Sequence, residues 1–468
     1  MKLRVDRKLV YAIISSLVSL WFATRQPPAG LTPEAMRAIA LLLWAVLAWL
    51  GQIAEDYVIA LALAVGWIVF EVAPFSVAFN TFSGASWWMI LGALGLGTAV
   101  ARSGLLRRIA LRTLLLFPAT VPGQSLGLIW TGLLIGPAIP SVIAKMAIAG
   151  RLVRGVTEAM QLPRGSRAGA ALFFSMFLGF GLAAPMYLTG TLTSLVIIAL
   201  LPESLVAQLT WTRWYLYSAP VLLGLVALGY LAIRWLFPAG TEQLDRQVLA
   251  RELAGLGKWS RAEKITAVVL VATLALWTTG SWHGINSTAI ALGALAVLLT
   301  LGVLDRDAFQ TGLGWSSLVF LGIILNLSTI VQHHRVDIYI GQQILPVLAP
   351  LTANPYLFAL VLALMVYLLR LVMVSYNALT TILMVILMPI TNAVGFSPWA
   401  LGMIIQLAAQ ATFLMQYQNS VYAVAYQSSG GAVNTPRQAS LYSLAFMAAT
   451  LVAISFAVFL WRAMGLIA

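Results

Sequence analysis

Apolar residues follow one another in long runs along most of this chain, with few charged positions inside the runs. A run of about 20 apolar residues matches the length of a helix that crosses a bilayer. Allowing for short flanks, such runs occur at Leu9–Ala23, Met36–Leu50, Tyr57–Phe75, Trp87–Ala101, Trp214–Leu236, Ile265–Thr279, Thr288–Val303, Leu318–Val331 and Leu441–Leu460. A transmembrane β-barrel would instead show alternating positions in strands of about 10 residues. The pattern therefore predicts an all-α polytopic membrane protein.

Four apolar segments contain Gly, Pro, Ser, Thr or Asn in the middle of the run. They lie at about 120–150, 168–201, 355–393 and 398–427. Backbone at membrane depth can leave the helix only where protein or a wet cavity satisfies its N–H and C=O groups. The first and third segments are therefore predicted as re-entrant hairpins, and the second and fourth as broken helices.

The interrupted segments recur in the same order in the two halves of the chain. "IPSVIAK" (Ile139–Lys145) in the first half corresponds to "VSYNALTT" (Val374–Thr381) in the second, and "YLTGTLTS" (Tyr187–Ser194) corresponds to "MQYQNS" (Met415–Ser420). Paired interruptions at corresponding places indicate a transporter that is built from repeats around a central site.

These features divide the chain into four parts. Residues 1–33 form a first helix, 34–233 a first repeat, 234–264 a basic linker with a short helix, and 265–468 a second repeat. One helix followed by five spans and one hairpin per repeat gives about 11 transmembrane helices. Because the number of spans per repeat is odd, the two repeats are expected to be inverted.

The charge balance gives an orientation for this topology. The chain has 27 Lys and Arg against 14 Asp and Glu, a net charge of +13. With the N-terminus and the linker inside, 20 of the 27 basic residues are cytoplasmic, as the positive-inside rule requires, and nucleic acid is not an expected partner. Lys145 and Arg370 remain at membrane depth. The basic residues expected outside are Arg25, Arg37, Arg213, Arg335 and Arg462.

The first segment starts with basic residues, as a signal peptide does, but it lacks a small-residue cleavage site. We therefore expect a retained first helix and a protein of the inner (plasma) membrane with a cytoplasmic N-terminus.

Composition argues against several other classes. The chain has no cysteine, which excludes thiolate metal sites, and no GxxxxGK[ST] motif for ATP. Its 3 histidines give no catalytic set at membrane depth, so an enzyme is not expected. Glu71 is the one acidic residue inside a clear apolar run, near its end, where an interfacial contact is favoured over a coupling proton. The adjacent His333 and His334 are expected to be solvated.

The broken segments collect polar groups that suit an anion. Half-helix N-termini supply free N–H groups and a positive dipole, and nearby hydroxyl and amide groups add donors. Those donors are Ser141, Thr189, Thr191, Thr193, Ser375, Asn377 and Asn419. Gly190 would let the backbone approach closely. The alternative for any single Ser or Thr is a hydrogen bond back to its own helix.

Lys145 and Arg370 are cations where a charge is costly unless it is paired or reaches the interface. One hypothesis makes them a fixed positive field beside the anion, or a replacement for a bound Na⁺. The alternative is that Lys145 extends to the cytoplasmic interface and that Arg370 binds backbone carbonyls. Since Lys145 follows Ser141 by four residues, both are expected on one face of a helix.

Several motifs resemble one transporter family in order and spacing over nearly the whole chain. "IPSVIAKM" is similar to the "PSNTAR" hairpin tip of the divalent-anion:sodium symporters, which carry dicarboxylates, citrate or sulfate. "LTGTLTSLV" (Leu188–Val196) is similar to their "GTPPN"-type break, and "FLMQYQNSVYAVAY" (Phe413–Tyr426) to its second copy. The ending "FLWRAMGL" (Phe459–Leu466) resembles the usual C-terminus.

The resemblance implies an eleven-helix fold and a homodimer, in which a transport domain moves past a fixed scaffold as an elevator. No cofactor is implied besides Na⁺, which would bind at Ser141, Gly190, Ser375 and Asn377. The small anionic substrate would bind at Ser141, Lys145, Thr189, Gly190, Thr191, Ser375, Asn377, Thr380, Gln418 and Asn419.

The chain also departs from the family pattern. Val142 and Ile143 replace a polar Asn-Thr pair, and Lys145 stands where one branch has Arg. In the second tip either Ser375 and Asn377 or Thr380 and Thr381 match. The expected function is secondary transport of di- or tri-anions across the cytoplasmic membrane, by Na⁺ symport or anion exchange. The alternatives are an anion channel and a proton-coupled carrier of another anion.

Overall fold

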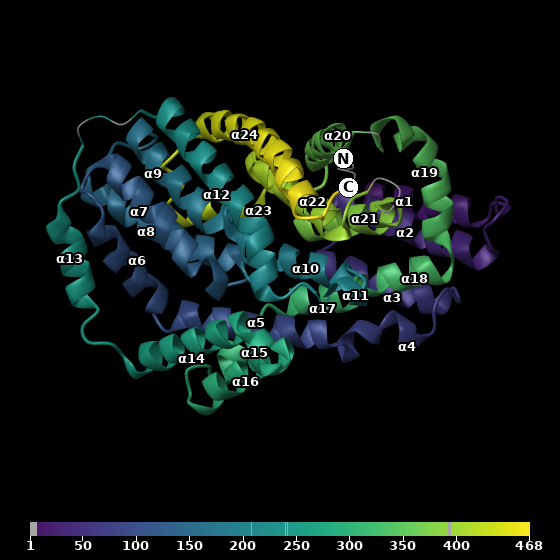
Figure 1. The fold of residues 1–468 in the computed structure, drawn as a ribbon, viewed down its shortest axis with the longest axis horizontal. Helices are drawn as coiled ribbons and strands as arrows, with labels where there is room; N and C mark the ends of the chain where they lie inside the picture. Colours follow the sequence, from purple (N-terminus) through teal and green to yellow (C-terminus); the bar gives the residue numbers. More distant parts are fainter. Residues whose placement is uncertain (1–6, 207, 239, 241, 353, 392–394) are drawn as a thin grey trace, which may run out of the picture.

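The computed structural model describes residues 7–206, 208–238, 240, 242–352, 354–391 and 395–468. Residues 1–6, which include Lys2 and Arg4 of the expected cytoplasmic N-terminus, lie outside the described residues. Throughout the described part, the regular structure is helical, with two isolated β-bridges (Figure 1). The prediction of an all-α membrane fold is confirmed.

The first half of the chain starts with α1 and ends with the long helix α12. Its elements are α1 (Arg7–Ala23), α2 (Pro33–Gly51), α3 (Asp56–Val69), α4 (Phe75–Ala78), α5 (Ala85–Arg102), α6 (Leu105–Leu116), α7 (Val121–Ile135), α8 (Val142–Ala159), α9 (Arg167–Phe177), α10 (Leu192–Leu200), α11 (Glu203–Val206) and α12 (Trp211–Leu236).

The linker and the second half contain the remaining elements. They are α13 (Arg246–Gly255), α14 (Arg261–Thr278), α15 (Gly280–His283), α16 (Ser287–Thr300), α17 (Trp315–Ile324), α18 (Asn326–His333), α19 (Val336–Thr352), α20 (Pro355–Arg370), α21 (Tyr376–Leu387), α22 (Pro398–Ala411), α23 (Ser420–Ser428) and α24 (Pro436–Ala463). The expected short helix in the linker is α13.

Length and composition alone identify fewer spans than the eleven expected. Among the described residues, 5 helices are long and apolar enough to cross a membrane, or 6 if α5 and α6, which are bent by 64°, form one span. The other expected spans are shorter apolar helices, such as α3 and α16, or the arms of broken segments. The count of eleven is consistent with this set.

The sequence analysis named no helix at α6 or α19, which follow the predicted spans Trp87–Ala101 and Leu318–Val331. The chain turns before α6 at Gly104 with φ +85° and before α19 at Arg335 with φ +54°, at corresponding places in the two halves. The predicted span Tyr57–Phe75 is also too long, because Glu71 with φ +55° follows the end of α3 at Val69. Left-handed backbone at these positions ends a helix that the apolar pattern would continue.

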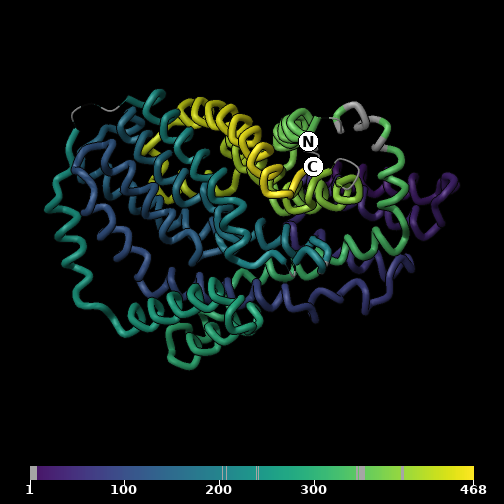
Figure 2. Tube along the Cα trace, viewed as in Figure 1, coloured from purple at the N-terminus to yellow at the C-terminus, as the bar shows by residue number. Residues whose placement is uncertain are grey.

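Two sets of packed helices each combine both halves of the chain, and blue segments of the first half run beside green segments of the second in Figure 2. In the first, here the α3 group, α3 packs against α2 and α17, and α5 against α16 and α14. In the second, here the hairpin group, α8 packs against α23, α10 against α21, and α12 against α24. In the hairpin group, the second arm of each hairpin therefore lies against the broken helix of the other half.

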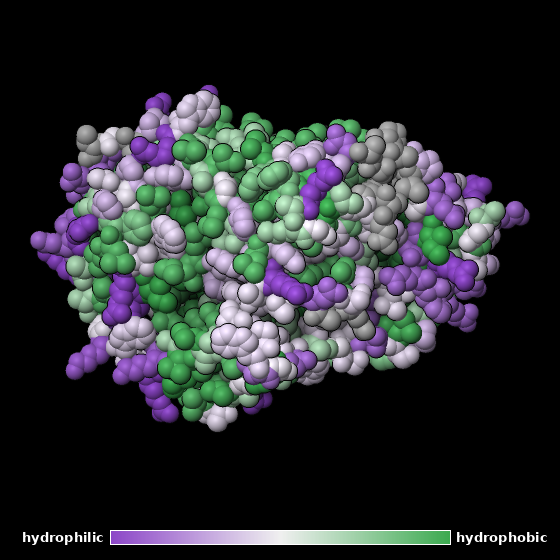
Figure 3. All heavy atoms as spheres, viewed as in Figure 1, coloured by the Kyte–Doolittle hydropathy of each residue, from purple (hydrophilic) through white to green (hydrophobic). Residues whose placement is uncertain are grey.

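The surface carries large apolar side chains. Trp235 is 78% exposed, Val268 69% and Leu231 62%. Figure 3 shows hydrophobic residues over large parts of one face, with hydrophilic residues gathered toward its two ends. Such a surface suits contact with lipid, where apolar side chains need no protein cover.

Candidate functional site

The first hairpin turns at a proline-rich tip. α7 ends at Ile135, and Pro137 and Pro140 prevent the helix from continuing, because proline lacks an N–H and constrains the residue before it. Ser141 then serves as the N-cap of α8, and its Oγ accepts a hydrogen bond of 3.3 Å from the Ala144 N–H. The second half-helix of this hairpin thus begins directly after Ser141.

The second hairpin has the same design without proline. α20 ends at Arg370, and Ser375 is the N-cap of α21, with its Oγ accepting a hydrogen bond of 3.3 Å from the Ala378 N–H. Ser375 therefore has the same position in the second hairpin that Ser141 has in the first.

Both broken helices also restart at a capping residue. Thr191 is the N-cap of α10, and Asn419 is the N-cap of α23, where its Oδ1 accepts a hydrogen bond of 2.9 Å from the Tyr422 N–H. Gly190, just before the first cap, has no room for a side chain, because a Cβ would lie 2.0 Å from the Ala184 carbonyl oxygen. The break thus needs glycine at this position for close backbone approach.

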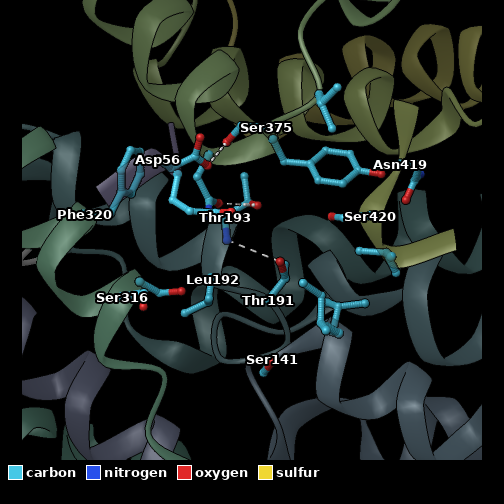
Figure 4. Close-up of a pocket in the computed structure, with 18 of the residues that line it drawn as sticks. Asp56, Ser141, Thr191, Leu192, Thr193, Ser316, Phe320, Ser375, Asn419 and Ser420 are labelled. Carbon is cyan, nitrogen blue, oxygen red and sulfur yellow. Dashed lines mark hydrogen bonds between the residues drawn. The ribbon is translucent and has the colours of Figure 1, made fainter. Parts of the chain in front are cut away.

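All four capping residues line one cavity of about 800 Å³. They are Ser141 and Ser375 from the hairpin tips and Thr191 and Asn419 from the breaks (Figure 4). The N-termini of four helices of 9 to 18 residues therefore meet at this cavity. The dipoles of these helices produce a positive potential at the cavity, which favours an anion.

The predicted substrate-binding residues divide into two sets. Those that line the cavity are Ser141, Thr191, Ser375, Asn377 and Asn419. Those that lie behind its wall are Lys145, Thr189, Gly190, Thr380 and Gln418, of which Thr189 donates a hydrogen bond of 2.8 Å to the Pro137 carbonyl. The structure brings both sets into the same region, at the tips and the breaks.

Lys145 neither faces the cavity nor reaches the membrane interface. Its side chain is 0% exposed, and its Nζ donates a hydrogen bond of 2.8 Å to the Gly190 carbonyl. The Lys145 N–H donates a hydrogen bond of 3.0 Å to the Ser141 carbonyl, so the two residues are one helical turn apart. Ser141 lines the cavity, whereas the Lys145 side chain points to the Gly190 carbonyl.

Arg370 is equally buried and binds backbone carbonyls. Its guanidinium donates hydrogen bonds to the carbonyls of Met373 and Val374 within the second hairpin and to the carbonyl of Gln418 in the second break. It also lies over the ring of Tyr376, with Cζ 4.2 Å from the ring centroid. These contacts match the hypothesis that Arg370 binds backbone carbonyls. The contacts stabilise the second hairpin tip.

The Na⁺ ligands implied by the resemblance already have other partners. The Gly190 carbonyl accepts from Lys145, and Asn377 Oδ1 accepts a hydrogen bond of 3.0 Å from Thr193 Oγ1. Ser375 Oγ donates to a carboxylate, Asp56 Oδ2, at 2.6 Å. An ammonium group thus already stands at one of the carbonyls that the resemblance implies for Na⁺.

Several cavity residues were missed by the sequence analysis. Asp56, Gln410 and Ser420 line the cavity, and Thr193, named only as a donor, does so too. Asp56 comes directly after a short turn between two apolar runs. An acidic residue at such a position is ordinarily expected at the membrane interface. Its pairing with a residue 319 positions away could not be read from local sequence.

Other acidic and histidine positions lie apart from the cavity. The Glu71 side chain is 86% exposed and 3.9 Å from Arg37. His334 Nε2 lies 2.7 Å from the Val72 carbonyl oxygen. Among the described residues, no cluster of three or more His, Asp or Glu could hold a metal.

Comparison with known proteins identifies the family. The model of the sodium:sulfate symporter transmembrane region matches residues 6–467. A membrane protein of Cupriavidus necator is 25% identical over 433 residues, which are 88% of this chain and 84% of that protein. A chloroplast protein of Arabidopsis thaliana named dicarboxylate transporter 1 is 25% identical over 332 residues, which are 69% of this chain but only 59% of that protein.

Solved structures show the same fold at low identity. MtrF of Neisseria gonorrhoeae, described as one of a class of antimetabolite efflux pumps, has a TM-score of 0.59 at 14% identity over 96% of this chain and 94% of its own. The YdaH transporter of Alcanivorax borkumensis has a TM-score of 0.56 at 17% identity over 92% and 98%. With the family match over nearly the whole chain, these findings confirm the resemblance. The chain belongs to the sodium:sulfate symporter family of divalent-anion transporters, and it is a multi-pass membrane transport protein rather than an enzyme.

Proposed function

We propose that this chain is a secondary transporter that exchanges small dicarboxylates across the cytoplasmic membrane without coupling to Na⁺. The observation that carries the proposal is the pair of buried cations, Lys145 and Arg370, on the backbone carbonyls of the two breaks. The names of relatives in the family, dicarboxylate transporters of chloroplasts, support the substrate class.

The cavity has the groups that a dicarboxylate needs. Each carboxylate can accept hydrogen bonds from a hairpin-tip hydroxyl, Ser141 or Ser375, and from the N–H groups at that helix N-terminus. Thr191 and Asn419 offer further polar groups from the breaks. Two equivalent tips on one cavity suit a substrate with an anionic group at each end.

The buried cations supply what a bound Na⁺ would otherwise provide. An unpaired carbonyl at membrane depth costs several kcal/mol, and an ammonium or guanidinium group satisfies it as a metal ion would. Lys145 donates a hydrogen bond to the carbonyl of Gly190, the residue before the cap of α10. Arg370 donates a hydrogen bond to the carbonyl of Gln418, the residue before the cap of α23. Since these cations belong to the chain, they stay when the substrate leaves, so transport needs no ion gradient.

The two packing groups support an elevator movement. We propose that the hairpin group carries the cavity, and that the α3 group is the fixed scaffold of a homodimer. In this arrangement residues 34–233 and 265–468 are inverted repeats, 234–264 is cytoplasmic, and the N-terminus lies on the same side of the inner membrane. Tight packing of α8 on α23 and of α10 on α21 would let the hairpin group move as one body.

Counterflow in proteoliposomes tests the function. Vesicles with the purified protein are loaded with unlabelled succinate, malate, citrate or sulfate, and the uptake of labelled succinate is followed. We expect uptake that saturates with succinate and is driven by internal succinate or malate. Conduction that does not saturate would instead indicate a channel, and counterflow with sulfate but not with dicarboxylates would contradict the substrate class. The variant Arg151→Met, an exposed change on α8, should behave as the unaltered chain.

A further inference from the structure

The cavity that would hold an anion also contains a carboxylate of the protein. Asp56 is the first residue of α3 and is half-buried at the cavity wall. Ser375 Oγ donates a hydrogen bond of 2.6 Å to Asp56 Oδ2, and Figure 4 shows the two side chains pointing toward one another. A hydroxyl-to-carboxylate bond of this length is of the strong, charge-assisted kind.

Asp56 occupies a place where substrate is expected. Ser375 caps α21, so the carboxylate that it holds also lies at the positive end of that helix. Under the proposed function, one carboxylate of the substrate binds at this tip. Asp56 therefore offers the tip the same chemical group that the substrate offers.

The first hairpin tip differs in this respect. Ser141 Oγ accepts a hydrogen bond from Ala144, and within the described part of the chain no recorded bond links Ser141 to an acidic side chain. Figure 4 shows Ser141 and Ser375 on opposite sides of the space between the labelled residues. One tip is open to an incoming carboxylate, and the other is already bound to Asp56.

The Asp56–Ser375 bond also connects the two packing groups. α3 packs against α2 and α17, whereas α21 packs against α10 and α22. If the hairpin group moves relative to the α3 group, this hydrogen bond must break. The hairpin group can therefore move only when Ser375 is no longer bonded to Asp56.

We propose that Asp56 is an intramolecular competitor of the substrate, which holds the empty hairpin group to α3 through Ser375 until a substrate carboxylate displaces it. This inference rests on the proposed function. A dicarboxylate that binds both tips releases the Asp56 bond and frees the hairpin group to move. Without substrate, the hairpin group stays bonded to α3, so it crosses the membrane slowly when it is empty. Exchange of one substrate for another is therefore favoured over net transport.

Charge repulsion makes the displacement one-for-one. An ionised substrate carboxylate and ionised Asp56 compete for the tip, because like charges at hydrogen-bond distance repel strongly away from water. The other charged side chains that line the cavity are Glu55, which precedes Asp56, and Lys8. Glu55 adds to the negative charge that a bound carboxylate would meet beside Asp56.

The variants Asp56→Ala and Asp56→Asn test the competition in proteoliposomes and in binding assays with succinate. We expect Asp56→Ala to bind succinate about tenfold tighter, the change that follows from removing a competing charge-assisted hydrogen bond. Net succinate efflux into buffer without substrate should rise relative to exchange. Asp56→Asn, which keeps an acceptor for Ser375 but loses the charge, should lie between Asp56→Ala and the unaltered chain.

Glu71→Gln is the matched control, because Glu71 is an exposed acid just beyond the other end of α3. It should change neither the succinate affinity nor the ratio of net efflux to exchange. An Asp56→Ala variant with an unchanged ratio and affinity would overturn the proposal. Weaker succinate binding in Asp56→Ala would also overturn it, because Asp56 would then support the site rather than compete for it.

A measurement without substrate separates this proposal from the proposed function. Amide hydrogen exchange at residues 373–379 reports whether the second tip is held. We expect faster exchange there in substrate-free Asp56→Ala than in the unaltered chain and in Glu71→Gln, and equal rates would contradict the hold. If the unaltered chain exchanged no dicarboxylate, the proposed function would fail, whereas the exchange rates would still decide whether Asp56 holds the tip.

Discussion

The Nζ of Lys145 donates a hydrogen bond of 2.8 Å to the carbonyl oxygen of Gly190. This bond joins the first hairpin to the first break, and it has a counterpart in the second half, where Arg370 binds the carbonyl of Gln418. Each carbonyl belongs to the residue just before the cap of a half-helix. The two halves thus use different cations from different hairpin arms for the same purpose.

Lys145→Met should destabilise the protein. It removes the donor and leaves the Gly190 carbonyl buried without a partner, which costs about 1–3 kcal/mol. Lys145→Arg should retain part of the stability, because it keeps a positive donor in the same place. Thermal unfolding in detergent measures both, with Arg151→Met, an exposed change on the same helix, as the control. Equal unfolding temperatures for Lys145→Met and Arg151→Met would contradict a role for the Lys145 hydrogen bond.

Lys145→Ala should make the protein respond to Na⁺. The shorter side chain leaves space beside the Gly190 carbonyl, where a small cation can replace the lost ammonium group. We expect the unfolding temperature of Lys145→Ala to be higher in NaCl than in choline chloride, because a ligand that binds the folded state stabilises it. The unaltered chain and Arg151→Ala should show no such difference. If Lys145→Ala gave the same temperature in both salts, the lysine would not stand at a cation position.

A buried ion pair should stabilise the linker region. Arg108 Nε lies 2.6 Å from Glu263 Oε1, with both side chains at most 5% exposed, and Arg108 also donates to the carbonyls of Leu256 and Gly257. Removing one member of a buried pair costs about 3–5 kcal/mol. Glu263→Ala should therefore lower the unfolding temperature strongly.

The exposed pair of Arg107 and Glu252 is the control for this ion pair. Its side chains are 56% and 35% exposed, and such a pair contributes about 0–1 kcal/mol. Glu252→Ala should leave the unfolding temperature nearly unchanged. If Glu252→Ala and Glu263→Ala lowered the unfolding temperature by similar amounts, burial would not determine how much an ion pair contributes to stability here.

The proposed orientation predicts which side of the membrane each surface faces. Because the chain has no cysteine, single cysteines can be introduced without background. Gln247→Cys in α13 should resist an impermeant thiol reagent in intact cells, and Met464→Cys after α24 should react. The reverse pattern of labelling would invert the topology.

The sequence predicted the hairpins and breaks because local chemistry forms them. Pro137 and Pro140 favour a break in the helix because proline lacks the N–H that a helix interior needs, and Ser141, Thr191 and Ser375 are capping residues by type. Five of the ten predicted substrate-binding residues line the cavity for this reason. Their polar side chains sit at helix starts, which the order of residues alone reveals.

The remaining features depend on packing between distant segments. Lys145 turns toward Gly190 because α8 lies beside the first break, and helical phase alone does not give that direction. Asp56 reaches the cavity because α3 starts beside the second tip, although the two residues are in different halves of the chain. α6 and α19 begin at left-handed turns that the apolar pattern does not mark.

The most direct test of the built-in cations is succinate counterflow measured with and without Na⁺. Proteoliposomes loaded with succinate are placed in labelled succinate with NaCl, KCl or choline chloride on both sides, at equal ionic strength. Since Lys145 and Arg370 satisfy the carbonyls of Gly190 and Gln418 without a metal ion, we predict equal initial rates in the three salts. Counterflow that requires Na⁺, with a rate that rises and saturates as Na⁺ is added, would contradict the account.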